Sequence, residues 1–161
     1  MPGDFDLAVE FRHASWFASG TLSDRAFAVL QKHRAGAVIT DVAGRRDVCH
    51  AALPVPFVMV RFVGNNLHPT DFPRVDAWIA RLVEWRSLGL GRAYFFAHQP
   101  DDGFAPETLA HFTTGARAAG VHIPEATIEP PPSPQLAFFG ASAAPETTPS
   151  KKKAARAPTR R

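Results

Sequence analysis

Four apolar segments of this sequence carry charged or polar residues that could hold a ligand and act on it. In the first, residues 7–12, Glu10 and Arg12 stand two positions apart and His13 follows directly. A β-strand would present Glu10 and Arg12 on the same face, because side chains alternate along a strand. Charged groups within apolar strands cost free energy unless they are paired or used.

Three later apolar segments each deliver one polar residue: Asp41 at the end of 37–41, Arg61 within 57–63, and His98 at the end of 92–98. Reactive groups of barrel-like sheets lie at the carboxyl ends of the strands. We therefore expect the four segments to contribute to one site at a common edge of the sheet.

The first interpretation of this set is a pocket for a small anionic ligand. Arg12 and Arg61 would grip a phosphate or carboxylate through fork-like hydrogen bonds, and a nearby group would exchange a proton with the ligand. The catalytic candidates are Glu10, Asp41 and His98, and the remaining ligand-binding candidates are His13, Asn65 and Asn66.

The alternative is a structural ion network that satisfies the polar core of a barrel, formed by Glu10, Arg12, Arg61 and Asp41. Residue spacing alone does not separate this network from a ligand site. No metal site is expected, because the candidate ligands lie on different elements without HxH or HExxH spacing: His13, Asp41, His68 and His98. No cofactor follows from any motif, since GxGxxG and GxxxxGK[ST] are both absent from the sequence.

Helices are expected between the strands. Ser23 can cap a helix that Gly36 ends, and Asp71 with Pro73 opens a helix that buries Val75, Trp78, Ile79 and Leu82 on one face. A last helix starts at Pro106, ends at Gly120 and turns Leu109, Phe112 and Ala116 inward. Alternating strands and helices predict an α/β fold with a mostly parallel sheet of about four strands covered by helices.

Composition restricts the cysteine chemistry and the cellular location that we expect for the protein. The chain has a single cysteine, Cys49, which excludes an intramolecular disulfide and a cysteine-cluster metal site. We find no apolar run long enough to span a membrane and no signal-peptide pattern at the start, so a cytoplasmic protein is expected.

The predicted domain covers residues 1–128, and residues 129–161 are expected to form a disordered tail, first proline-rich and then basic. The net charge of +3 comes from this tail, because six of the 18 lysines and arginines lie in its last eleven residues.

Gln135, Leu136 and Phe139 resemble the peptide with which bacterial proteins dock on the replication sliding clamp, although Phe138 replaces the usual leucine. The alternative is that this apolar island folds back onto the domain. The basic run could add attraction to DNA.

Several stretches together resemble the YecE-like family, known as domain of unknown function 72: AVEFRHASWF, TDVAG, FVMVRFVGNNLHPTDFPRVDAWIARL and RAYFFAHQPDDGFAPETLAHF. The resemblance implies part of a TIM-like (βα) barrel. The N-terminal half of the usual barrel, which begins with a GTSGW-like strand, has no counterpart here. It implies no reaction, substrate or cofactor, because the family has none assigned.

Half a barrel would expose two strand edges and its inner face. The expected explanations are a misassigned start codon or split gene, a decaying fragment, or a half-barrel that closes by pairing with another copy. Three functions therefore remain open at this point: a binder of a small anionic ligand, an interaction protein that reaches a clamp and DNA through its tail, and a fragment without independent function.

Overall fold

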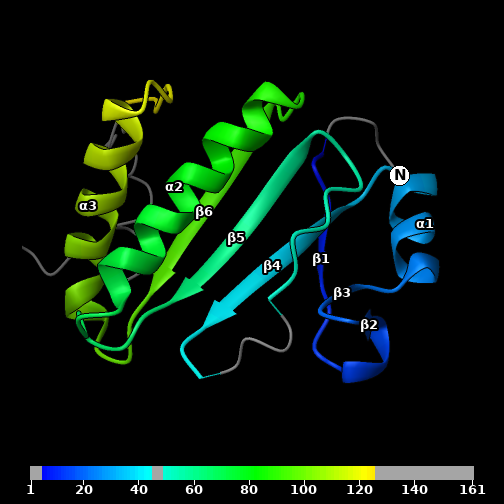
Figure 1. Cartoon of the computed structure of the whole chain (residues 1–161), viewed down its shortest axis with the longest axis horizontal. Coiled ribbons are helices and arrows are strands. Elements are labelled where there is room, and N and C mark those ends of the chain that lie inside the picture. Colours follow the sequence, from blue (N-terminus) through cyan, green and yellow to red (C-terminus); the bar gives the residue numbers. More distant parts are fainter. Residues whose placement is uncertain (1–4, 45–48, 126–161) are drawn as a thin grey trace, which may run out of the picture. The chain divides into compact units, whose positions relative to one another are not determined.

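The computed structural model describes residues 5–44 and 49–125, which belong almost entirely to a compact unit, Met1–Pro124. Its main sheet is parallel throughout, with strand order β1-β4-β5-β6. The four strands are β1 (Ala8–Glu10), β4 (Gly36–Val42), β5 (Phe57–Val63) and β6 (Arg92–His98). The predicted parallel α/β sheet is thus confirmed, and Figure 1 shows β4, β5 and β6 running side by side.

The helices cover one face of this sheet. They are α1 (Asp24–Lys32), α2 (Asp71–Ser87) and α3 (Ala105–Ala118), with short 3-10 turns η1 (Ala14–Trp16) and η3 (Asp102–Phe104). Ile39, Val58, Val60 and Phe62 pack against the apolar face of α2, and the predicted inward residues of that helix are all buried. A second cluster joins Ala26 and Leu30 of α1 to Ala37 of β4. Ala37 and Ile39 share one face of β4, so both clusters lie on the same side of the sheet.

The opposite face of the sheet is concave. Asp6, just before β1, accepts hydrogen bonds from Arg92 and Tyr94 of β6, the latter at 3.1 Å. Strands β1 and β6 are the two edges of the sheet, so a contact between them requires the sheet to curl strongly. Phe96 of β6 lies on this face and is half exposed.

A small hairpin was not expected from the sequence. Strands β2 (Phe17–Ala18) and β3 (Thr21–Leu22) pair antiparallel around Ser19 and Gly20, both of which have positive φ. Left-handed backbone at both central residues is the pattern of a tight hairpin turn. Strands of two residues give no alternating apolar pattern, which explains why the sequence did not reveal them.

Two expectations about the helices were wrong. Gly36 does not end α1, which stops at Lys32 and turns through Arg34 at φ 52°; Gly36 instead begins β4. Its role is close packing, since a Cβ there would come within 2.6 Å of the Phe57 ring. Leu109 of α3 is exposed, and the neighbouring Thr108 is buried in its place.

Within the described residues, no helix is long and apolar enough to cross a membrane. The predicted tail at 129–161, including Gln135, Leu136 and Phe139, lies outside the residues that the structure describes. Its clamp-docking motif therefore stays a prediction.

Candidate functional site

Three of the predicted residues meet on the concave face. The carboxylate of Glu10, at the end of β1, accepts a hydrogen bond from Arg12 Nε at 3.0 Å and another from Arg61 Nη1 at 3.4 Å, both on the same oxygen, Oε1. The side chain of Arg12 is largely exposed, whereas that of Arg61 is 34% exposed and that of Glu10 23%. We refer to Glu10, Arg12 and Arg61 as the concave cluster. It holds two guanidinium groups and one carboxylate, so its net charge is positive.

Strand register explains how residues 51 positions apart come together. Glu10 lies opposite Val38 of β4, and Thr40, two residues further along β4, lies opposite Arg61 of β5. Residues paired across a parallel sheet project from the same face. The strands therefore carry Glu10, Thr40 and Arg61 to the concave side near their carboxyl ends.

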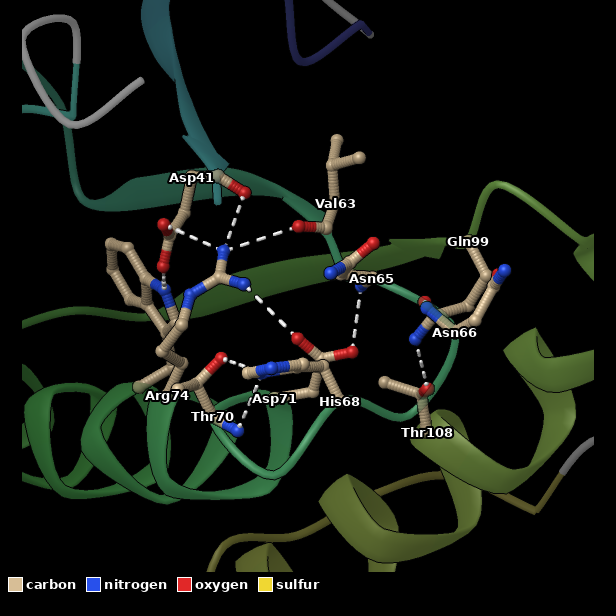
Figure 2. A network of polar contacts seen from close by, with 11 residues as sticks. Asp41, Val63, Asn65, Asn66, His68, Thr70, Asp71, Arg74, Gln99 and Thr108 are labelled. Atoms are coloured by element: carbon tan, nitrogen blue, oxygen red, sulfur yellow. Dashed lines mark hydrogen bonds and ion pairs between the residues drawn. The ribbon is translucent and has the colours of Figure 1, made fainter. Parts of the chain in front are cut away.

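Asp41 faces the other way, so the predicted four-residue ion network does not form. It is buried, with 1% of its side chain exposed, and it projects toward α2. There Oδ1 accepts from Arg74 Nη2 at 2.8 Å and Oδ2 accepts from the indole Nε1 of Trp78 at 2.8 Å (Figure 2). The reason for the error is that adjacent residues of a strand point to opposite faces, and Asp41 follows Thr40.

Arg74 of α2 links this acid to the neighbouring elements. Its Nη2 also donates to the backbone carbonyls of Asp41 and Val63, each at 3.1 Å, and its Nη1 donates to Asp71 Oδ1 at 3.3 Å. The guanidinium lies over the Phe62 ring, 4.4 Å from the ring centre. We call Asp41, Asp71, Arg74 and Trp78 the clasp, because they join α2 to the carboxyl ends of the central strands β4 and β5 (Figure 2).

Sequence reasoning overlooked Arg74. The available signal was its spacing from Asp71, since residues three apart on a helix lie side by side. Nothing in the sequence pairs Arg74 with Asp41, which lies 33 residues earlier and on a different element.

The asparagines after β5 serve the loop itself. The backbone N–H of Asn65 donates to Asp71 Oδ2 at 2.7 Å, and that of Asn66 donates to Gln99 Oε1 at 2.8 Å. The side-chain oxygen of Asn66 accepts from the backbone N–H of Asp101 at 2.9 Å. Asn66 and Leu67 both have positive φ, so hydrogen bonds from neighbouring loops hold a backbone conformation that is costly for these residue types.

The two remaining candidates are histidines near the carboxyl ends of the edge strands. His98 ends β6, lies opposite Val63 and is exposed on the concave side. His13 caps η1: its Nδ1 accepts from the backbone N–H of Ser15 at 3.2 Å and lies 2.8 Å from the Ser15 hydroxyl. Among the described residues, no group of three or more histidine, cysteine, aspartate or glutamate side chains could hold a metal ion.

A cavity of about 570 Å³ lies on the helix-covered side, lined in part by His50, Trp78 and Arg81. Cys49 also lines it and is half-buried. Burial lowers the pKa of His50, and an interaction with the Val38 backbone opposes that shift. The ring of His50 packs near Phe17, and its Nδ1 accepts from the backbone N–H of Ala52 at 3.2 Å. This cavity adjoins the clasp and not the concave cluster.

Comparisons with known proteins agree on one family. The family model described as "Protein of unknown function DUF72" matches residues 1–135. The chain is 28% identical over 127 residues to UPF0759 protein YecE of Escherichia coli K12, and the same protein of strain O157:H7 matches equally well. The alignment covers 68% of this chain and 46% of YecE, so the chain spans about half the length of the curated relatives it matches.

Two solved structures share the fold. A DUF72 family protein from Thermotoga maritima MSB8 matches with a TM-score of 0.53 and 20% identity, covering 69% of this chain and 46% of that one. A DUF72 family protein from Enterococcus faecalis V583 matches with a TM-score of 0.54 and 16% identity, covering 70% and 49%. The expected partial, TIM-barrel-like α/β fold is thus confirmed.

Proposed function

The chain belongs to the DUF72 family, and from the geometry of its concave face we propose that it binds a small anionic ligand, a phosphate or a carboxylate, at the concave cluster. The observation that carries this proposal is the sharing of one carboxylate oxygen by Arg12 and Arg61. One carboxylate neutralises only one of the two cations. The remaining positive charge lies near the carboxyl ends of parallel strands. Proteins with such sheets generally bind their ligands at these ends.

The chemistry of the guanidinium group supports an oxyanion as the ligand. Its planar fork of N–H donors matches two oxygens of a carboxylate or phosphate, and such charge-assisted bonds are about twice as strong as neutral ones. The side chains of Arg12 and Arg61 are both partly exposed, so an anion can reach them without opening the core. Glu10 and His98 are two groups on this face that could exchange a proton with a bound ligand.

Thermal unfolding with added ligand tests the proposal. Inorganic phosphate should raise the melting temperature of the full chain relative to sodium chloride of equal ionic strength, because a ligand that binds only the folded state stabilises it by about 2.7 kcal/mol at a hundred times its dissociation constant. Parallel titrations with acetate and citrate separate phosphate from carboxylate preference.

Matched arginine variants locate the site. Replacing Arg12 and Arg61 together by glutamine should abolish the phosphate effect, whereas Arg81→Gln should keep it, because Arg81 lies on α2 beside Trp85. Equal stabilisation of the double variant by phosphate would show that the concave cluster is not the site.

Glu10→Gln should tighten phosphate binding, since the variant removes the carboxylate that competes with the ligand for both guanidinium groups.

A further inference from the structure

Thr40 lies next to the concave cluster but takes no part in its hydrogen bonds. It is the fifth residue of β4, directly opposite Arg61 of β5. Asp41 projects toward α2, where it accepts hydrogen bonds from Trp78 and Arg74. Because neighbouring side chains of a strand point to opposite faces, Thr40 points to the concave face. The residue thus stands beside Arg61, one strand closer to Glu10.

The hydroxyl group of Thr40 is buried without a partner. The residue is 8% exposed, and its Oγ1 forms no hydrogen bond with any of the residues that the structure describes. Leaving a buried hydroxyl unpaired costs free energy, and each such group in a native protein calls for an explanation. Valine has nearly the same shape and would avoid this cost, and apolar residues already surround Thr40 on β4: Val38, Ile39 and Val42.

We propose that the hydroxyl of Thr40 is the third donor to the oxyanion held by Arg12 and Arg61, and that the ligand is therefore a phosphate group. This inference rests on the proposed function and extends it. The three donors come from three neighbouring strands: Arg12 just after β1, Thr40 on β4 and Arg61 on β5. A planar carboxylate offers two oxygens and is satisfied by one guanidinium fork, whereas a phosphate offers three or more oxygens to donors from different directions.

The proposal gives Thr40→Val an unusual combination of effects. The variant removes an unpaired buried hydroxyl without changing the side-chain volume much, so its melting temperature without ligand should equal or exceed that of the wild type. It also removes one donor to a charged ligand, so the dissociation constant for inorganic phosphate should rise roughly ten-fold or more. Thr40→Ser keeps the hydroxyl and should retain most of the affinity.

Calorimetric titration of the full chain with inorganic phosphate and with acetate, together with melting curves, decides the question. Weaker phosphate binding by Thr40→Val at unchanged or higher melting temperature, with acetate binding nearly unaffected, supports the proposal. If Arg61→Gln weakens phosphate binding but Thr40→Val does not, the role of Thr40 is wrong and the anion site stands. If neither substitution weakens it, the anion site itself is wrong.

A lower melting temperature for Thr40→Val without ligand would also overturn the inference. It would mean that the hydroxyl already stabilises the folded chain, as it would when bonded to a permanently bound water molecule. Thr40→Ser provides the control here, because it keeps the hydroxyl. In that case its melting temperature should be higher than that of Thr40→Val, whatever its affinity for phosphate.

Discussion

The two faces of one sheet handle their charged residues in opposite ways. On the helix-covered face, Asp41 is buried and the side chain of Arg74 is only 13% exposed. Hydrogen bonds from the Arg74 guanidinium reach the Asp41 carboxylate and two backbone carbonyls. On the concave face, Glu10 is shared between two arginines that remain partly open to solvent. An ion pair that is largely shielded from solvent and held by several hydrogen bonds fixes structure, whereas an exposed and unevenly matched cluster can still accept a ligand.

This comparison shows why charged residues in a strand are weak evidence of function by themselves. Asp41 and Arg61 lie on adjacent strands, one residue apart in register, and both interrupt apolar segments. They differ in what their side chains face: Asp41 points to a helix, whereas Arg61 points to the solvent-exposed concave side. Experiments that disturb each face should therefore give different kinds of result.

The largest effect is expected from Asp41→Ala. Removing one partner of a buried ion pair leaves the other charge uncompensated, which typically costs about 3–5 kcal/mol. Urea denaturation should show a loss of this order, while Glu84→Ala should change stability by less than about 1 kcal/mol, because its pairing with Arg81 is 3.5 Å long and exposed. Similar losses in the two variants would contradict the distinction between the clasp and a surface pair.

A smaller loss is expected from Gly64→Ala, directly after β5. A Cβ at this position would come within 2.3 Å of the Gln99 amide, and Gln99 is held by Asn66 and Thr108. Displacing Gln99 should cost about 1–3 kcal/mol, as overpacking generally does.

Two further variants sharpen the Gly64 result. Gly91→Ala is the matched control, because its Cβ would meet only a backbone oxygen at 3.4 Å. Combining Gly64→Ala with Gln99→Ala should cost less than the two single losses added together, since the clash disappears with the amide. Strict additivity in chemical denaturation would show that the two residues do not compete for the same space.

The smallest expected effect is a dependence of stability on pH through His50, on the helix-covered side. Burial lowers the pKa of His50, so as the pH falls below about 6.5 the unfolded chain takes up a proton before the folded chain does. Stability is therefore lost on acidification, by at most about 1.4 kcal/mol per pH unit from one group.

A comparison with His50→Asn isolates this contribution, because asparagine retains an acceptor for the Ala52 N–H and does not titrate. The wild type should lose more stability than the variant between pH 7.5 and pH 5.5 in thermal unfolding. Parallel pH profiles for the two proteins would rule out His50 as the source.

Much of the fold could be predicted from the sequence. The segments 57–63 and 92–98 are long, apolar and rich in β-formers, and they became β5 and β6 with the predicted bounds. The face of α2 followed from its 3.6-residue period. Local patterns of this kind predict structure well because the same residues determine both the type of element and its buried side.

The candidate site was harder to predict because its geometry depends on distant residues. Glu10 meets Arg61 through the register of β1, β4 and β5, which no local pattern specifies. Strand β4 is buried on both faces apart from its last residue, so its sequence lacks the polar alternation that would show which way Asp41 points. Its partner Arg74 belongs to a helix two elements later.

The burial of Trp78, which donates to Asp41, also gives the helix-covered face an optical signal of its own. Trp78 and Trp85 are buried with their rings 6.2 Å apart, whereas Trp16, beyond the end of β1, is 42% exposed. A water-soluble quencher should therefore reach the fluorescence of Trp16 first and leave that of the clasp nearly intact. Intrinsic emission can thus follow the integrity of one face while a ligand binds at the other.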